Sequence, residues 1–361
     1  MIAARGIAGL WAALCLWLVA GAAMAQPQAT LLTYADLDGW AQDDHAAALA
    51  VFRNTCGDMR DTEWQNLCDF AAQAAEGPTP AERAQNARTF FELFFLPVMI
   101  TEGADMLFTG YFEPELRGAL LPDAQYRYPI YSLPPELPAS GPWLTRRQIE
   151  QSGRLADRGL EIAWLADPVD AIFLQIQGSG RVRLPDGTVI RVGYAGANRH
   201  PYTSLGQVLV RRGIYEPHQV SADVIRSWVS RNPDEGRRLL WANASYVFFR
   251  EVTQVPAHLG PLGAMNRSVS ELRTVAVDPH FAAMGAPVWI EKDGPDPLNR
   301  LMTAQDTGSA IKGAQRADIF YGTGRSAGYI AGRTRAGGRM VLLLPVQLAL
   351  LRLQNPETVI R

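Results

Sequence analysis

Residues 301–324 read LMTAQDTGSAIKGAQRADIFYGTG, and this stretch near the C-terminal end decides how we interpret the chain. Two short apolar runs, 301–304 and 319–321, have the composition of β-strands, and each lies beside an aspartate, which is depleted inside strands. The loop between them is rich in glycine, so its backbone can approach a ligand closely. Acids at strand ends beside such loops are a common active-site arrangement, although Asp306 and Asp318 could equally be ordinary turn residues.

The composition is that of a globular protein, with 48% hydrophobic and 19% charged residues among 361. This length is enough for two domains. The 32 glycines and 24 prolines favour strands and loops over a helical bundle. A net charge of −2 provides no strongly basic surface of the kind that binds nucleic acid or an anionic membrane.

The first 25 residues have the parts of a secretory signal peptide. Arg5 supplies the positive charge, residues 7–20 are apolar, and a small-x-small cleavage site ends at Ala25. We therefore expect export and cleavage. Because residue 26 is glutamine and Cys15 lies inside the apolar run, we find no cysteine suited to lipid attachment.

Cleavage would leave two cysteines, Cys56 and Cys68. An even pair in an exported protein predicts a disulfide, with two free thiols as the alternative. Apolar residues recur at helical spacing over 43–54, 61–75 and 80–95, so the bond would tie the first of these helices to the second.

Past residue 106 the pattern changes to short strands and turns. Gln175 and Gln177 lie two apart in an apolar run that we interpret as a strand, so both amides would project from one face. Gly178-Ser179-Gly180 follows, and the surface would suit neutral hydroxyl and acetamido groups, unless it is only a solvated sheet face. We expect a hairpin turn at 185–187 and a small closed barrel in the last hundred residues. The expected helices are 145–152, 203–212 and 221–230, and the expected strands include 106–113, 126–133, 241–249, 272–277, 288–291, 329–331 and 340–344.

Several classes of site lack their motifs. The five histidines are scattered, and there is neither HExxH nor a CxxC pair, so we expect no metal. No GxGxxG follows a strand and opens a helix, so we expect no nucleotide and no other cofactor. Ser179 lacks the surroundings of a nucleophile elbow.

Carboxylate chemistry remains, with Asp278 joining Asp306 and Asp318 as candidates. One carboxylic acid with a raised pKa can serve as general acid and then as base at a glycosidic oxygen. Glycosidases usually need a second carboxylate, unless the substrate supplies its own nucleophilic hydroxyl. Lys312 is one of only two lysines among 34 basic residues, which weakly suggests a need for a compact ammonium group.

Several blocks together resemble the membrane-bound lytic murein transglycosylase A family with its C-terminal three-aspartate domain. The blocks, in chain order, are FTGYFEP at 108–114, LQIQGSG at 174–180, GYAGAN at 193–198, WANASYVFFR at 241–250, VDP at 277–279, QDTGSAIKG at 305–313 and ADIFYGTG at 317–324. The resemblance extends over roughly residues 40–345.

This resemblance implies a mainly β fold with N-terminal helices, in which a double-psi β-barrel domain carries an inserted second β-barrel domain, with a glycan groove between them. The helical segment and first barrel would comprise 26–112 and 246–345, the inserted domain 113–245, and a C-terminal tail 346–361. The implied reaction cleaves the β-1,4 bond between N-acetylmuramic acid and N-acetylglucosamine. The muramoyl C6 hydroxyl attacks C1 and leaves a 1,6-anhydro end.

The same resemblance makes Asp318 the acid/base, with Asp306 and Asp278 as supports. The family is anchored through a lipidated cysteine, so its absence here predicts a soluble periplasmic enzyme. We expect a monomer that binds peptidoglycan glycan strands and neither nucleic acid nor nucleotide, and a complex with cell-wall synthesis enzymes stays open. The candidate groove residues are Thr109, Tyr111, Gln175, Gln177, Ser179, Asn198 and Lys312.

Two other interpretations compete with this one. A true hydrolase would pair Asp318 with Asp306 or Glu113 and release reducing ends. A glycan-binding module without activity would bind strands and leave them intact.

Overall fold

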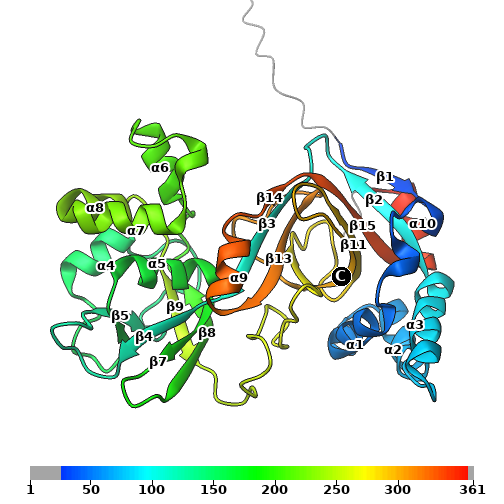
Figure 1. Ribbon diagram of the computed structural model, residues 1–361, viewed down its shortest axis with the longest axis horizontal. Coiled ribbons are helices and arrows are strands. Elements are labelled where there is room, and N and C mark those ends of the chain that lie inside the picture. Colours follow the sequence, from blue (N-terminus) through cyan, green and yellow to red (C-terminus); the bar gives the residue numbers. More distant parts are fainter. Residues whose placement is uncertain (1–25, 357–361) are drawn as a thin grey trace, which may run out of the picture.

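The computed structural model describes residues 26–356 and shows two β lobes side by side, with a group of helices at the outer end of one of them (Figure 1). The predicted signal peptide, residues 1–25, lies outside the described residues. Between residues 26 and 356, no helix has both the length and the apolar character needed to cross a membrane.

The larger lobe, on the right in Figure 1, is built on a nine-stranded sheet. Its strands are β1 (Gln28–Leu31), β2 (Phe95–Thr101), β3 (Leu107–Glu113), β10 (Thr274–Val277), β11 (Pro287–Lys292), β12 (Leu298–Asp306), β13 (Arg316–Thr323), β14 (Arg335–Ala336) and β15 (Gly338–Pro345). Their order in space is β1-β2-β15-β11-β12-β10-β13-β3-β14. Most neighbours are antiparallel, but β10 is parallel to β12 and β13 is parallel to β3. Segments far apart in the sequence are therefore brought together in the middle of the sheet.

Three helices cover part of this sheet, and each begins at a side-chain cap. They are α1 (His45–Cys56), α2 (Thr62–Ala74) and α3 (Pro80–Phe94). Asp44 and Asp61 accept backbone N–H bonds at the first two helix starts, and Thr79 forms a capping box with Glu82 at the third. Their buried aromatic side chains join the sheet in one hydrophobic core with Trp289.

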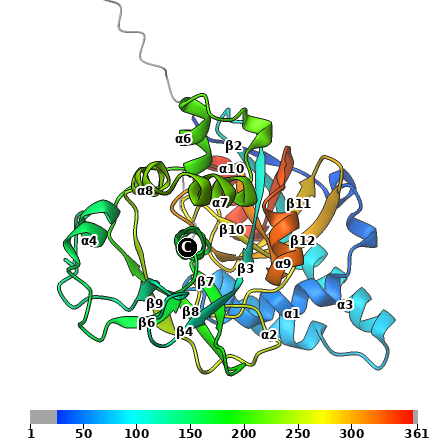
Figure 2. The same ribbon diagram turned by 60° about the vertical axis from the view of Figure 1, so that its left-hand side comes forward.

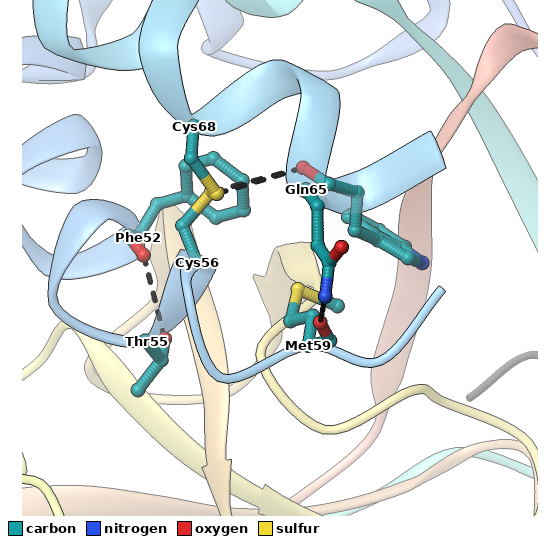
Figure 3. Close-up of a disulfide and its surroundings, with 7 residues drawn as sticks. Phe52, Thr55, Cys56, Met59, Gln65 and Cys68 are labelled. Carbon is teal, nitrogen blue, oxygen red and sulfur yellow. Dashed lines mark hydrogen bonds between the residues drawn. A yellow bond between two sulfur atoms is a disulfide. The ribbon is translucent and has the colours of Figure 1, made fainter. Parts of the chain in front are cut away.

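A disulfide joins Cys56 at the end of α1 to Cys68 in α2, as the sequence predicts. Figure 3 shows the bond between the two helices, with Phe52 and Met59 close by. The two Cα atoms are 5.7 Å apart. Closing a loop of this size stabilises a fold by about 3 kcal/mol, chiefly by restricting the unfolded chain.

The second lobe is an insertion between β3 and β10, built on a six-stranded sheet. Its strands are β4 (Glu115–Ala119), β5 (Tyr128–Tyr131), β6 (Glu161–Leu165), β7 (Ser179–Arg183), β8 (Val189–Ala197) and β9 (Val247–Glu251). Their order is β5-β6-β4-β7-β8-β9. The helices α4 (Arg146–Ser152), α5 (Pro168–Gln177), α6 (Leu205–Arg211), α7 (Ala222–Arg231) and α8 (Pro233–Trp241) complete the lobe, and Figure 2 shows α6, α7 and α8 together above its strands. A mainly β fold with N-terminal helices and an inserted β domain is confirmed.

The predicted return to the first domain at residue 246 is wrong. Strand β9 pairs with β8 in the six-stranded sheet, so the inserted lobe continues to Glu251. The sequence shows β9 as a strand but does not show which sheet receives it, because both sheets accept a β-branched and aromatic run of this kind.

The largest error in the predicted secondary structure concerns Gln175 and Gln177. They lie in helix α5, about 200° apart around its axis, and do not share a strand face. Asp167 caps this helix, Pro168 occupies its first turn, and Gly178 ends it at φ 77°. These signals for the start and the end of a helix are present in the sequence. The short apolar run between them, however, is compatible with either a helix or a strand.

Three smaller predictions also fail for local reasons. Pro233 opens helix α8, which continues to Trp241, so the strand expected over 241–249 begins only at Val247. The helix expected over 80–95 ends one residue earlier, because Phe95 opens β2.

Residues 329–331 belong to helix α9 (Gly324–Ala331) and are not a strand. This helix packs against β3 through two glycines, since a Cβ at Gly110 would lie 2.7 Å from the Cα of Ala331, and one at Gly328 would lie 2.7 Å from the ring of Phe112. The C-terminal segment, expected as a tail, contains helix α10 (Val346–Gln354), which lies against β1, β2 and β15.

Candidate active site

Four neighbouring strands bring the two later aspartates and Thr109 into one row. Ala276 of β10 pairs with Asp306 of β12 on one side and with Asp318 of β13 on the other. Asp318 in turn pairs with Thr109 of β3. Side chains of directly paired residues project from the same face of a sheet. The row therefore presents two carboxyl groups and a hydroxyl group on one face.

The surroundings of this row are apolar. Ala276 stands between the two aspartates and has only a methyl group, so it leaves space between their carboxyl groups. A small hydrophobic cluster of Tyr111, Val269, Ala276, Ile311 and Phe320 lines the same region. Burial of this kind disfavours a charged carboxylate and raises its pKa.

Asp318 makes one short hydrogen bond. Its Oδ1 atom accepts a hydrogen bond from the hydroxyl group of Thr109 at 2.6 Å, and that hydroxyl oxygen accepts a hydrogen bond from Nη2 of Arg316 at 2.8 Å. Burial raises the pKa of Asp318 above its ordinary value, while the Thr109 hydroxyl and the Arg316 charge oppose the rise. Its Oδ2 atom accepts no hydrogen bond from residues 26–356, so it can face a ligand.

Asp306 is held differently. Its Oδ1 atom accepts backbone N–H bonds from Ala264 at 3.0 Å and from Thr307 at 2.9 Å. Burial raises the pKa of Asp306 to about 6, although both backbone bonds favour the ionised form. The nearby charge of Asp318 adds to the rise. Asp306 thus braces the loop at Ala264, a role that Asp318 does not share.

Tyr111 closes the space beside both aspartates. Its pKa is raised well above the ordinary value, first by burial and then by the charges of Asp306 and Asp318. Its buried hydroxyl makes no hydrogen bond of standard geometry within the described residues. An unpaired hydroxyl at this position can donate to a ligand oxygen or to Asp306.

Asp278 lies outside the row and holds the loop that joins β12 to β13. Its carboxylate accepts backbone N–H bonds from Gly313 at 3.0 Å and His280 at 3.2 Å. Lys312 is exposed, and its ammonium group lies 3.5 Å from the same carboxylate. Gly313 has φ +116° and packs so closely that a Cβ there would lie 2.6 Å from the carboxylate of Glu102. Asp278 and Lys312 therefore shape this loop together.

The two glutamines lie apart from the row and from each other. Oε1 of Gln175 accepts a hydrogen bond from the buried guanidinium of Arg146 at 2.5 Å, inside the inserted lobe. Oε1 of Gln177 accepts one from the backbone N–H of Phe112 at 2.9 Å. Gln177 thus supports β3, the strand that carries Thr109, and Gln175 belongs to a separate cavity.

Asn198 cannot serve as a groove residue, and that prediction is wrong. Its side chain is completely buried, and its amide group bonds to the backbone of Leu144, Ala244 and Tyr246. The family resemblance of the block around it suggested a ligand contact, but the amide instead satisfies backbone groups inside the lobe. Ser179 is also buried, at the start of β7 opposite Gly193.

Glu113, the alternative second carboxylate, is fully buried and already paired. It accepts hydrogen bonds from Arg181 at 2.9 Å, from Arg191 at 2.8 Å and from the hydroxyl group of Thr323 at 2.8 Å. A fully buried carboxylate that is paired with two arginines offers no exposed oxygen to a substrate. This group connects the two lobes at the end of β3 and takes no part in the row.

Two further residues, Arg316 and Glu102, support the site but were not predicted from the sequence. Arg316 lies two positions before Asp318 on β13, so the period-two pattern of a strand places both on one face and would have found it. Glu102 accepts the backbone N–H of Ala314 at 2.9 Å and holds the loop from the side opposite Asp278. No local signal marks it, because its partner lies 212 positions away.

The arrangement suits chemistry with one acid. Within residues 26–356, one carboxyl oxygen of Asp318 accepts no hydrogen bond and lies near an apolar cluster, and Asp306 and Asp278 hold the loops around it. Across residues 26–356, no three His, Cys, Asp or Glu side chains are grouped closely enough to hold a metal ion.

Two family models match the chain, one on each lobe. The MltA specific insert domain matches residues 107–250 and the 3D domain matches residues 273–344. The first covers the six-stranded lobe together with β3, and the second covers the strands that carry the three aspartates.

Several known proteins are similar to this chain over most of its length. Membrane-bound lytic murein transglycosylase A of Vibrio cholerae is 34% identical over 65% of this chain and 64% of its own length, slightly under two thirds. The crystal structure of a membrane-bound lytic murein transglycosylase from Agrobacterium tumefaciens has a TM-score of 0.77 and 34% identity, covering 90% of this chain and 99% of that one. Escherichia coli MltA with bound chitohexaose has a TM-score of 0.70 and 27% identity, covering 88% of this chain and 94% of that one.

Proposed function

The chain belongs to the membrane-bound lytic murein transglycosylase A family, and we propose that it cleaves the glycan strands of peptidoglycan without water. The bond broken is the β-1,4 bond between N-acetylmuramic acid and N-acetylglucosamine. The product is a 1,6-anhydromuramoyl end. The observation that carries this proposal is the carboxyl group of Asp318, which has one free oxygen, apolar surroundings and a raised pKa.

One acid is enough for this reaction. Protonated Asp318 gives its proton to the glycosidic oxygen as the C1–O bond breaks. The resulting carboxylate then takes the proton of the muramoyl C6 hydroxyl as that oxygen bonds to C1. The proton lost in the first step is regained in the second, so the enzyme ends as it began and no water is consumed. A raised pKa favours the starting form at neutral pH.

The other aspartates keep the loops in place around Asp318. Asp306 binds two backbone N–H groups and Asp278 binds two more, which restrains both ends of the segment that connects β12 to β13. Rigid support of this kind keeps a catalytic group within the narrow range of productive positions. Thr109 in this row and Tyr111 beside it are the candidates for contacts with sugar.

The products of cleavage test this proposal. Purified murein sacculi are incubated with the mature protein, and the soluble products are examined by mass spectrometry. We expect muropeptides that are lighter by one water than the hydrolytic ones, because an internal ring replaces the reducing end. Reducing-end products would establish a two-carboxylate hydrolase, and binding without release would establish a glycan-binding module.

Replacing Thr109 with valine should change the pH dependence of cleavage. The Thr109 hydroxyl stabilises the ionised form of Asp318, so its loss raises the pKa of Asp318 further. We expect the alkaline limb of the kcat/KM profile to move to higher pH, because the acid stays protonated longer. The maximal rate should fall by about tenfold, which is less than the roughly 10²-fold or more that a general acid contributes, because the carboxyl group remains but loses its orientation.

Thr109→Ser is the matched control, since it keeps the hydroxyl group and should restore the wild-type profile. An unchanged alkaline limb in Thr109→Val, or a serine variant that behaves like the valine variant, would show that this hydroxyl does not act on Asp318.

For location, we propose the periplasm, where peptidoglycan lies. The relatives are membrane-bound by name, and the leader-like sequence of residues 1–25 supports export of this chain. Fractionation of cells that express the full chain tests this, with the protein expected in the periplasmic fraction.

A further inference from the structure

The inserted lobe contains a large cavity that takes no part in the aspartate row. Its volume is about 930 Å³, at the upper end of the range for small-ligand sites. Helices α4, α5, α7 and α8 and strands β5 and β6 surround it, and every lining residue lies between 127 and 246. None of the three aspartates contributes to its walls. The cavity is therefore separate from the aspartate row.

Flat aromatic side chains form much of its wall. Tyr128, Tyr131, Trp164, Trp241 and Tyr246 all line it. Two contacts fix the Trp241 ring: its Nε1 donates to Glu150 at 2.7 Å, and the guanidinium of Arg147 lies 5.4 Å from the ring centre. Rings that are fixed in this way offer apolar contact area at little cost in conformational entropy.

The base of the cavity is a buried guanidinium. Arg146 is 1% exposed and bonds to Gln175 and to the backbone carbonyls of Asn243 and Ser245. Its one acidic neighbour within the described residues is Glu150, at 3.4 Å, which also holds Trp241. Most of the groups around this buried positive charge are neutral, so the charge favours an anion in the cavity.

The charges at the rim have the same sign. Arg127 and Arg237 are exposed at the opening, and no carboxylate within residues 26–356 lies at ion-pair distance from either. Arg226 differs, because Asp167, Asp170 and Asp223 surround it. Four arginines and two acids line the cavity, a local formal charge of +2 in a chain whose net charge is −2.

We propose that this cavity binds a short peptide that carries free carboxylates. Unpaired guanidinium groups recognise carboxylates through paired N–H donors, and the aromatic walls accept the apolar parts of a peptide. The proposal rests on the proposed function in one respect, namely that peptidoglycan supplies such peptides as the acidic stems attached to its muramoyl residues. The cavity would then hold the stem while the glycan lies at the aspartate row.

Helix α5 connects the two sites. Gln175 on this helix lines the cavity and holds Arg146, and Gln177, two residues later on the opposite side of the helix, supports the backbone of β3. A ligand at Arg146 therefore contacts the helix that supports the strand of Thr109. Helix α5 thus contacts both the cavity and β3, which is a strand of the aspartate row.

A binding titration tests the proposal without any cleavage. The probe is the free tripeptide L-Ala-γ-D-Glu-meso-diaminopimelate, titrated into the mature protein by calorimetry and followed by tryptophan fluorescence. We expect saturable binding with a Kd below about 1 mM, which corresponds to a binding free energy more favourable than about −4 kcal/mol. The double variant Arg127→Ala/Arg237→Ala should bind at least tenfold more weakly, because it loses both unpaired rim charges.

The matched control is Arg117→Ala/Arg238→Ala, which removes two exposed arginines outside the cavity, one of them next to Arg237 and paired with Glu235. It should bind within twofold of wild type. No binding by the wild-type protein, equal weakening in both double variants, equal affinity for a tripeptide with amidated carboxylates, or full displacement by an equal concentration of inorganic phosphate would each overturn the proposal. Peptide binding by a protein that fails to cleave sacculi would leave this inference standing and remove the proposed function.

Discussion

Asp318→Asn should abolish cleavage of sacculi while the protein stays folded. The amide keeps the size of the carboxyl group, and its oxygen can still accept the hydrogen bond from Thr109. It can neither deliver a proton to the glycosidic oxygen nor take one from the C6 hydroxyl. General acid–base catalysis contributes about 10²- to 10⁴-fold, and both steps need the group, so we expect the rate to fall by at least about 10³-fold. Release of soluble muropeptides over time measures it.

The same variant should be no less stable than wild type at neutral pH. Burial raises the pKa of Asp318, so the ionised form is disfavoured in the folded state, and the unfolded chain ionises more readily as the pH rises. A neutral amide removes this free-energy cost of burying an ionisable carboxyl group. Thermal unfolding at pH 7.5 and co-sedimentation with murein sacculi would show that the fold and the binding of the proposed substrate are intact.

Asp69→Asn is the control, because Asp69 is exposed on α2 and lies outside the site. It should cleave at the wild-type rate. If Asp318→Asn kept more than a tenth of that rate, Asp318 would not be the acid, and Asp306, with its pKa of about 6, would take its place as the candidate.

Sequence patterns could locate the strands of the site but not their arrangement. The apolar runs before Asp306 and around Asp318 predict two strands, and both are present. The row across β12, β10, β13 and β3 depends on two parallel pairings between segments that are distant in the chain. Local composition carries no information about such pairings, so the position of Ala276 between the two aspartates could not be predicted.

Errors in the predicted site arose where a polar side chain serves the fold. Asn198 and Gln175 look like ligands in the sequence, yet each is buried and satisfies groups inside the inserted lobe. A buried amide needs partners wherever it lies, and only the three-dimensional structure shows whether those partners are backbone or ligand. Glu113 is likewise a buried polar side chain that serves the fold, and its substitution should have larger consequences for stability.

Glu113→Gln should be the most destabilising single substitution considered for this protein. The wild-type carboxylate is completely buried and lies 2.9 Å from Arg181 and 2.8 Å from Arg191, whose side chains are 16% and 8% exposed. The variant leaves two largely buried guanidinium groups without an anion. Removing one partner of a buried ion pair costs about 3–5 kcal/mol, because the remaining charge stays desolvated. Denaturant unfolding should show the midpoint moving to a lower concentration with an unchanged slope.

The effect should extend beyond Glu113, because the same arginines hold the link between the lobes. Arg191 donates to the carbonyl of Pro256 at 3.2 Å, and Arg181 donates to that of Leu259 at 3.2 Å, on the segment that returns from β9 to β10. We therefore expect this segment to become more sensitive to limited proteolysis in the variant. Glu235→Gln, which breaks an exposed pair with Arg238, is the control and should change stability by less than about 1 kcal/mol.

The same variant separates the two chemical mechanisms. If Glu113 holds the lobes together and does not react, Glu113→Gln that is kept folded at low temperature should still release anhydro products, at a rate that follows its folded fraction. Loss of cleavage in a fully folded sample would make Glu113 the second carboxylate of a hydrolase. Wild-type stability in the variant would mean that the two arginines find other anions, and the ion-pair cluster would then not be what joins the lobes.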